Sequence, residues 1–397
     1  MTFPDERWLL PEGIEELLPP RAARLEQLRR ELLDLYRGWG YELVVPPFIE
    51  YLETLLTGTG NDLDLQTFKL TDQLSGRMMG VRADMTPQVA RIEARYLRKS
   101  APSRLCYMGT VLRTRPAGIG GSRSPLQVGV ELYGHAGVAS DVEVLRLMVE
   151  TLTVSGIEQL HLDLGHVGIF RALARQAELD PQQESILFDA LQRKARPEIE
   201  EYLEELKLPA SLSQMFASLV TLNGGLEVLE LAGEHLRDGS NDLQAALLSL
   251  KAIAQQLHGH LPDLALHFDL AELRGYRYHT GAVFAVYVPG HGQAVAQGGR
   301  YDDIGRVFGR ARPATGFSTD LKTLVMLGST NSGTPEKGGI LAPVDAESAE
   351  LRQRIKQLRE TGERVIEYLP GQSGDERELG CDRRLVYQGG EWRVIPL

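Results

Sequence analysis

The arrangement of strand and helix patterns along the chain constrains its fold more than any other feature of the sequence. Residues 41–135 are rich in strand patterns, in which β-branched and aromatic residues are separated by glycine, aspartate and serine turns. Residues 169–260 carry helical patterns almost throughout, and strand patterns return at 264–288. A strand-rich region that is interrupted by helices and then resumed predicts an α+β fold. We expect an antiparallel sheet flanked by helices, with a helical insertion, rather than a doubly wound sheet.

Apolar periodicity and capping residues predict the helices that flank these strands. The predicted helices cover residues 21–40, 87–99, 140–155 and 320–328. Thr86 is a good N-cap for the second of these helices, and Ser140 or Asp141 for the third.

The polar segment 329–339 is rich in glycine, serine and threonine, which predicts a linker. We therefore expect a large domain over residues 1–328, with its insertion at about 169–260, and a small C-terminal domain over 340–397. For the small domain, the sequence predicts a βαββ unit that ends in a hairpin at Gly389–Gly390.

Charge and cysteine content argue against several functional classes. The 43 Lys and Arg residues are outnumbered by 54 Asp and Glu residues, giving a net charge of −11, and no basic run suits a nucleic acid. Cys106 and Cys381 lie far apart, and the histidines form no metal-binding motif. Neither a secretion signal nor an apolar run of membrane-spanning length is present. We expect a cytoplasmic protein that uses no metal or other cofactor and binds neither nucleic acid nor membrane.

Two late segments, LRGYRYHTGAVF at 273–284 and AQGGRYDD at 296–303, predict a polar pocket on a sheet. Glycines let the backbone approach a ligand, arginines supply forked donors, and tyrosines form walls with a polar tip. The alternative is that Gly298–Gly299 only form a hairpin turn while Arg300 and Asp302 pair on the surface.

Further polar residues on neighbouring predicted strands complete a candidate site. Carboxylates suit an ammonium group and arginines suit a carboxylate, so the set matches what an α-amino acid requires. The candidate ligand-binding residues are Asp84, Thr86, Arg113, Gln127, Glu131, Arg274 and Tyr278, and Arg300 is a further polar residue of the set.

Several of these residues also have a purely structural interpretation. Thr86 can serve only as an N-cap, and Asp84 can pair with Arg82 or Arg91. Arg113 can be a structural ion-pair partner.

Gln127 and Glu131 share one face of their predicted strand, and burying them without partners is costly. This favours a ligand or Arg113 as their partner. His279 is interpreted as a core or wall histidine rather than a general base.

Taken together, these motifs resemble those of class II aminoacyl-tRNA synthetases, and of histidyl-tRNA synthetase in particular. PPFIE at 46–50 resembles the first class II motif, which implies a dimer-forming role. VLRTRP resembles the second motif and places Arg113 at the α-phosphate and carboxylate. VRADMT resembles the amino-acid-binding stretch and places Asp84 and Thr86 at the ammonium. The two late segments resemble signatures of the histidine enzyme, with Arg274 at the position of its catalytic arginine.

The chain departs from that family at the nucleotide site. Thr323 stands where the third class II motif has an ATP-clamping arginine, and Lys322 replaces the usual acid. Arg115 stands where an acid reads adenine, and Tyr276-Arg277-Tyr278-His279 replaces Leu-Asp-Tyr-Tyr. Loss of a bidentate phosphate contact costs about 2–4 kcal/mol of transition-state stabilisation. Adenylation is therefore not expected.

A synthetase-like body with a lost ATP clamp and a short tail resembles the regulatory subunits of ATP phosphoribosyltransferase. The resemblance implies that no residue is catalytic and that the chain pairs with a short-form catalytic subunit. It further implies dimers within hetero-octamers of four regulatory and four catalytic chains. Such a complex performs the first step of histidine biosynthesis under feedback inhibition by histidine, a candidate ligand of the pocket. The alternatives are a histidine-activating class II ligase and a synthetase-like amino-acid sensor.

Overall fold

The computed structural model describes residues 9–57, 61–116, 118, 121–276, 278–328, 338–344, 348–372 and 378–397. The chain divides into two compact units at 329/330, and we refer to them as the N-terminal and C-terminal units. Across these ranges, no helix combines the length and the apolar character needed to cross a membrane.

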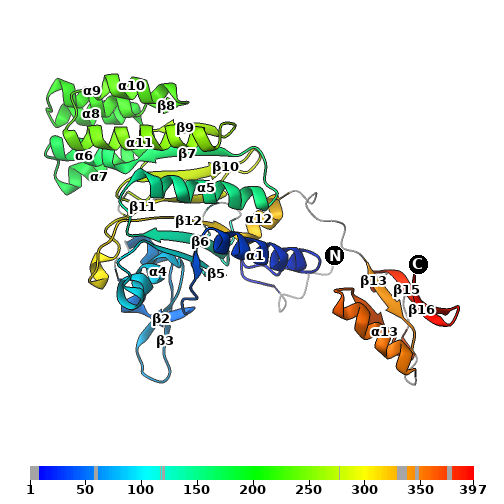
Figure 1. Cartoon of the computed structure of the whole chain (residues 1–397). Helices are drawn as coiled ribbons and strands as arrows, with labels where there is room; N and C mark the ends of the chain where they lie inside the picture. Colours follow the sequence, from blue (N-terminus) through cyan, green and yellow to red (C-terminus); the bar gives the residue numbers. More distant parts are fainter. Residues whose placement is uncertain are drawn as a thin grey trace, which may run out of the picture. The chain divides into compact units, whose positions relative to one another are not determined.

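Nine strands form the main sheet of the N-terminal unit, in the order β1-β5-β6-β12-β11-β10-β7-β9-β8 (Figure 1). Their bounds are β1 Glu42–Leu43, β5 Ser103–Thr110, β6 Leu126–Tyr133, β7 His161–His166, β8 Asn223–Gly224, β9 Ala265–Asp269, β10 Ala282–Tyr287, β11 Ala296–Arg300 and β12 Ala314–Asp320. Among the described strands of this sheet, only β1 with β5 and β7 with β9 are parallel pairs. The fold is α+β as predicted, but the sheet is mixed rather than wholly antiparallel.

Three helices pack along this sheet: α1 Arg21–Gly38, α5 Val138–Val154 and α12 Leu321–Leu327 (Figure 1). Leu28, Leu32 and Tyr36 recur every four residues along α1 and are fully buried, which is the spacing of one helix face. The N-cap of α5 is Gly137, so the prediction of Ser140 or Asp141 as its cap is wrong. Both residues lie in the first turn of the helix, where they contact Arg300.

The helical insertion follows β7 and lies at the β7–β9 end of the sheet (Figure 1). Its helices are α6 Val167–Gln176, α7 Pro181–Gln192, α8 Arg196–Glu205, α9 Ala210–Leu219, α10 Glu227–His235 and α11 Asn241–His260. Phe170, Phe216 and Leu250 are fully buried members of its core. Its apolar residues join the same core cluster as α1 and α5, so the insertion is anchored to the sheet rather than tethered by a hinge.

A separate three-stranded sheet, ordered β2-β4-β3, lies in the segment between β1 and β5. Its elements are β2 Ile49–Tyr51, α2 Leu52–Leu55, α3 Asn61–Gln66, β3 Phe68–Thr71, β4 Met78–Val81, α4 Thr86–Ile92 and the π-helical turn η2 Glu93–Leu97. The helix predicted over 87–99 is thus an α-helix followed by a π-helical segment. The N-cap of α4 is Met85 and no side chain caps it, so the prediction that Thr86 is the N-cap is wrong.

The described part of the C-terminal unit contains a four-stranded sheet, ordered β14-β13-β15-β16, and one helix. Its bounds are β13 Gly339–Ala342, α13 Ala349–Glu360, β14 Val365–Glu367, β15 Cys381–Gln388 and β16 Glu391–Pro396. The hairpin turns at Gly389 and Gly390, whose φ angles of +61° and +85° suit glycine. The unit is therefore βαβββ, one strand more than predicted. Residues 329–337 of the predicted linker lie outside the described residues.

Candidate functional site

Two adjoining cavities lie over the central strands of the main sheet. The small cavity, of about 200 Å³, is lined from β6, β10, β11, β12 and the segment before β10. The large cavity, of about 1150 Å³, is lined by residues 13–21, the loop before β6 and the start of α12. Arg274, Gln297 and Ser318 line both cavities, so the two are neighbours that share part of their walls.

Asp84 anchors one end of the small cavity. Its Oδ1 accepts hydrogen bonds from the Thr86 backbone N–H at 3.0 Å and from Gln127 Nε2 at 2.8 Å. Gln127 Oε1 in turn accepts the Met85 backbone N–H at 2.9 Å, which fixes the orientation of the amide. Asp84 Oδ2 has no partner among the described residues. The aspartate is thus held by one oxygen while the other can accept from a ligand ammonium.

Glu131 lies at the centre of a buried hydroxyl network. Tyr107 donates to its Oε1 at 2.9 Å, and Tyr301 donates to its Oε2. The Tyr107 hydroxyl also lies 3.1 Å from Thr86 Oγ1, which explains why Thr86 does not cap α4. Burial raises the pKa of Glu131 well above its usual range, although the Tyr107 hydrogen bond opposes that shift. A donor on a ligand would favour the charged carboxylate.

Glycines keep space open around Glu131. A Cβ at Gly316 would lie 1.7 Å from Glu131 Oε2, and a Cβ at Gly298 would lie 2.1 Å from the Gly316 carbonyl oxygen. Gly298 and Gly299 are inside β11, paired with β10 and β12, so the alternative of a hairpin turn is wrong. A side chain at either Gly298 or Gly316 would collide with a neighbouring strand or with the Glu131 carboxylate, so both positions require glycine.

Tyr278 and His279 form a further part of the wall of the small cavity. The Tyr278 ring stacks on Tyr301, with centroids 5.1 Å apart, and its hydroxyl is buried with no hydrogen-bond partner among the described residues. His279 Nδ1 lies 3.2 Å from the Arg274 carbonyl oxygen, and burial lowers its pKa to about 4. It is a neutral wall histidine, as the sequence suggested. The neighbouring Arg277 lies outside the described residues.

Arg274 is paired with neighbouring side chains. Its Nη2 donates to Glu272 Oε2 at 3.1 Å and to the Tyr287 hydroxyl at 2.7 Å, and its backbone N–H donates to Glu272 Oε1 at 2.7 Å. The carboxylate two residues earlier in the chain therefore neutralises the guanidinium. This arrangement suits a structural arginine better than one that contacts a reacting phosphate.

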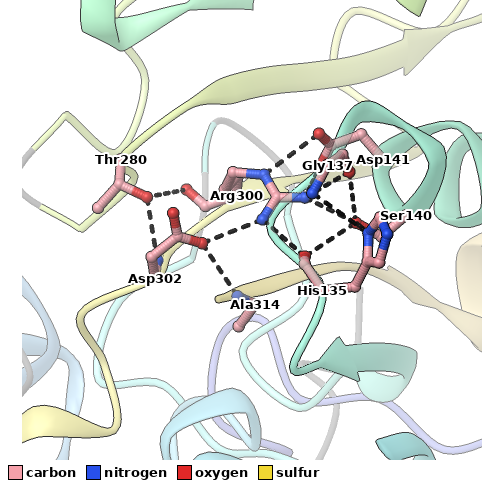
Figure 2. Close-up of polar contacts among 8 residues, drawn as sticks. All are labelled: His135, Gly137, Ser140, Asp141, Thr280, Arg300, Asp302 and Ala314. Carbon is pink, nitrogen blue, oxygen red and sulfur yellow. Dashed lines mark hydrogen bonds and ion pairs between the residues drawn. The ribbon is translucent and has the colours of Figure 1, made fainter. Parts of the chain in front are cut away.

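Arg300 lines neither cavity. The residue is 7% exposed, and its side chain bonds Asp141 at the start of α5, the carbonyl oxygen of His135 and Asp302 (Figure 2). The Arg300 carbonyl oxygen accepts the Thr280 backbone N–H at 2.7 Å. Arg300 and Asp302 do pair, but Arg300 is buried rather than on the surface. The network holds the residues that flank Tyr278 and Tyr301.

The large cavity contains Arg113. Its Nε donates to the Ala83 carbonyl oxygen at 3.3 Å, while its two Nη atoms have no partner among the described residues. Asp84 pairs with neither Arg82 nor Arg91: Arg82 donates to the carbonyl oxygens of Thr110 and Pro46, and Arg91 pairs with Glu50. The expectation that Arg113 partners Gln127 or Glu131 is also wrong, because Asp84 and the tyrosines satisfy them.

Residues at the start of α12 bond within the protein. Thr323 Oγ1 donates to Asp320 Oδ2 at 3.0 Å, so it stabilises the first turn of its own helix. Lys322 Nζ donates to Ser124 Oγ at 3.3 Å and lies 3.5 Å from Glu15 Oε1. Arg115 is exposed. No described residue at this position offers a bidentate clamp for a phosphate.

The structure thus divides the candidate residues between the cavities. Those that line the small cavity are Asp84, Thr86, Glu131, Arg274 and Tyr278, and those that line the large cavity are Arg113, Gln127 and Arg274. Sequence reasoning missed Tyr107, Tyr301 and Glu272. Tyr107 pairs with Gly129, midway between Gln127 and Glu131, a register that strand alternation alone does not give. Throughout the described part of the chain, no cluster of His, Cys, Asp or Glu suits a metal ion.

Models of two protein families match the chain. A histidyl-tRNA synthetase model matches residues 13–324, which include all residues that line the small cavity and most of those that line the large one. A model of the ATP phosphoribosyltransferase subunit HisZ C-terminal domain matches residues 337–395, in the C-terminal unit. The first model alone covers most of the chain, and the second distinguishes this chain from a synthetase.

Individual relatives agree with the family models. The chain is 60% identical to the ATP phosphoribosyltransferase regulatory subunit of Alkalilimnicola ehrlichii, covering 99% of this chain and 98% of that protein. It is 61% identical to that of Thioalkalivibrio sulfidiphilus, covering 98% and 99%.

Solved structures give the same result. A crystal structure from Bacillus halodurans described as an ATP phosphoribosyltransferase regulatory subunit/histidyl-tRNA synthetase is 27% identical, with a TM-score of 0.82 over 94% of this chain and 95% of that one. Histidyl-tRNA synthetase from Nostoc sp. PCC 7120, 19% identical, shares the fold with a TM-score of 0.77 over 98% and 97% of the two chains. The chain therefore belongs to the histidyl-tRNA synthetase-like family of ATP phosphoribosyltransferase regulatory subunits, which are non-catalytic.

Proposed function

We propose that this regulatory subunit of histidine biosynthesis binds L-histidine across the two cavities and uses its occupancy to inhibit a catalytic ATP phosphoribosyltransferase chain. One observation carries the proposal. The buried carboxyl of Glu131 and the buried hydroxyl of Tyr278, which has no hydrogen-bond partner among the described residues, both line a cavity that also contains Asp84.

The polar groups match the main-chain part of an amino acid. Asp84 Oδ2 and the Thr86 hydroxyl can accept from an ammonium. The Nη atoms of Arg113 have no partner within the described ranges and suit a carboxylate. Gln127 connects the two regions, since it bonds Asp84 and also lines the large cavity with Arg113. An α-amino acid presents both charges on adjacent atoms, so it fits the junction of the cavities.

The side-chain part of the cavity favours an imidazole. A neutral imidazole has one N–H donor and one nitrogen acceptor. Glu131 provides the acceptor for the first, and the Tyr278 hydroxyl provides a donor for the second. An apolar side chain of similar size would leave the buried Tyr278 hydroxyl unpaired, which is costly.

We also propose that the chain assembles with a short catalytic subunit, as dimers within a complex of four regulatory and four catalytic chains. A group of apolar side chains around the edge strand β1 supports self-association: Leu43, Val45, Phe48 and Ile49 are all at least 40% exposed. Such a patch beside a two-residue edge strand is typical of an interface. Adenylation is not part of the proposal, because Thr323 and Arg274 are committed to internal bonds.

Calorimetry on the full chain tests ligand binding, with L-histidine and L-phenylalanine as probes. We expect L-histidine to bind at least about 100-fold more tightly, because a site built for hydrogen bonds rejects a ring that lacks them. Equal affinity, or no binding of L-histidine either alone or with the catalytic subunit present, would overturn the proposal.

Enzyme assays test the role in the complex. The chain alone should give no histidine-dependent ATP–pyrophosphate exchange. Added to a short catalytic subunit, it should raise phosphoribosyl transfer and make that activity sensitive to L-histidine. Native mass spectrometry of the mixture should show four chains of each kind. Exchange by the chain alone would instead favour a histidine-activating ligase.

A further inference from the structure

We propose that Arg123 is a positioning residue for Arg113: it joins the N-terminal segment Leu9–Glu15 to the backbone of Arg113, so that the hold on a ligand carboxylate depends on that segment. The inference rests on the proposed function, because it concerns how the cavities hold the carboxylate of an amino acid. Arg123 is outside both cavities, so it acts only through its neighbours.

Arg123 bonds both partners with the same side chain. Its Nε donates to the Arg113 carbonyl oxygen at 3.1 Å, and its Nη1 donates to the Glu12 carbonyl oxygen at 3.1 Å. Its backbone N–H donates to the Gly13 carbonyl oxygen at 2.7 Å, and its own carbonyl oxygen accepts the Arg113 backbone N–H at 2.8 Å. A charged donor bridging two carbonyl oxygens fixes both segments more strongly than a neutral one.

The N-terminal segment passes very close to the Arg123 side chain at Gly13. A Cβ at this position would lie 2.9 Å from Arg123 Cγ, and its φ of +72° is one that other residues rarely adopt. Farther along the segment, the Glu15 carboxylate lies 3.5 Å from Lys322 Nζ, which also donates to Ser124 beside Arg123. The segment is therefore held at two points on the wall of the large cavity.

The position of the Arg113 side chain follows from that of its backbone. Only its Nε has a partner in the described structure, the Ala83 carbonyl oxygen at a long 3.3 Å, so the side chain contributes little to its own placement. Its backbone is paired with Arg123 on one side and bridged to Thr67 on the other. Removing the Arg123 side chain removes its Nε bond to the Arg113 carbonyl oxygen together with the attachment of Glu12, while the backbone bond between the two residues stays.

The test compares L-histidine with histamine, which keeps the imidazole and the ammonium but lacks the carboxylate. In Arg123→Met of the full chain, we expect the Kd for L-histidine to rise about tenfold, the loss of one charge-assisted contact, while the Kd for histamine changes less than about twofold. Gly13→Ala should act in the same direction. Arg104→Met is the matched control, because Arg104 also donates two hydrogen bonds from a half-buried side chain, to Glu143, away from both cavities.

The two ligands separate positioning from mere support of the fold. Equal losses for L-histidine and histamine, or no loss for either, would overturn the role of Arg123 while leaving the proposed function intact. A wild-type chain that binds no L-histidine would instead overturn the proposed function, and this inference with it.

A second measurement does not depend on any variant. Coupling between two sites is reciprocal, so L-histidine must stabilise the contact between Arg123 and the N-terminal segment. In the wild-type chain, L-histidine should slow hydrogen exchange of the Arg123 amide, which donates to Gly13, whereas histamine should not. Equal protection by both ligands, or none by L-histidine, would contradict the proposal.

Discussion

The small and the large cavity differ in how deeply their polar residues and the partners of those residues are buried. In the small cavity, Glu131 and its tyrosine partners stand on β5, β6 and next to β11, inside the main sheet, and each hydroxyl or carboxyl is buried. In the large cavity, Lys322 and Thr323 stand at the start of α12 and bond to nearby residues that remain partly exposed. Replacing a polar residue in the first region leaves a buried group without its partner, whereas replacement in the second costs little stability. This difference would allow a chain to lose a nucleotide clamp and still keep the amino-acid pocket that we propose.

We expect the largest loss of L-histidine affinity from a substitution of Asp84, which lines the small cavity. Asp84→Asn keeps the size of the side chain and an acceptor for the Thr86 N–H, but removes the charge that pairs with a ligand ammonium. We expect the affinity for L-histidine to fall about 100-fold, as for loss of a desolvated charge pair. Isothermal titration calorimetry measures the change.

Thr323→Ala is the matched control from the large cavity, with an expected change in L-histidine affinity of less than about twofold, because its hydroxyl bonds Asp320. Comparable losses in the two variants would mean that the cavities are not separable in this way.

Two tyrosines of the small cavity differ in whether their hydroxyls are bonded in the absence of a ligand. The Tyr301 hydroxyl donates to Glu131, whereas the Tyr278 hydroxyl has no partner in the described structure. Tyr278→Phe removes a hydroxyl without a partner in the described structure, so we expect about a tenfold loss of L-histidine affinity with unchanged stability. Tyr301→Phe removes a donor to buried Glu131, so the free energy of unfolding should fall by about 1–3 kcal/mol.

Urea denaturation and calorimetry on both tyrosine variants separate these effects. If Tyr278→Phe proves as destabilising as Tyr301→Phe, then the Tyr278 hydroxyl is part of the folded network rather than reserved for a ligand.

Acid should lower the stability of the folded chain through His279, which lines the small cavity. Burial lowers its pKa from 6.5 to about 4, so between these values the unfolded chain takes up a proton that the folded chain refuses. The free energy of unfolding therefore decreases as pH falls below 6.5, and His279 accounts for about 1 kcal/mol of that loss by pH 5.5.

His279→Asn should remove this share of the difference between denaturation curves at about pH 7 and about pH 5.5. His166, whose pKa burial also lowers to about 4, is the control outside both cavities and should keep its own share in that variant. An unchanged pH dependence in His279→Asn would show that the folded chain accepts the proton.

The sequence was sufficient for the fold class because the strand-rich, helix-rich and again strand-rich regions are long and strongly patterned. It was less reliable at the ends of elements. Thr86 has the right chemistry for an N-cap, yet its hydroxyl lies against Tyr107, a residue 21 positions away that periodicity does not bring near. The parallel pairing of β1 with β5 likewise depends on a long-range contact.

The sequence predicted which types of residue the candidate site contains, but not which of them bond to one another. Carboxylates and arginines could be named from motifs, whereas the pairing of Arg274 with Glu272 requires a turn that brings i and i+2 side chains together. The division into two cavities also could not be foreseen, because it depends on residues 13–21 reaching the loop before β6. Such contacts are set by tertiary packing rather than by local sequence.

The smallest effect is expected for Thr323→Arg, which returns an arginine to the position of the missing clamp. A single restored donor supplies about 2–4 kcal/mol of transition-state stabilisation at most. Two further differences would remain: Arg115, where the resemblance implies an acid, is exposed, and the Arg274 guanidinium is bound to Glu272 and Tyr287. Asp320 would keep the backbone N–H groups of Leu126 and Lys322, so the start of α12 should survive the change. We therefore expect ATP–pyrophosphate exchange to stay at background. Exchange above background would mean that the large cavity still binds a nucleotide productively, and that the loss of activity rests on Thr323 alone.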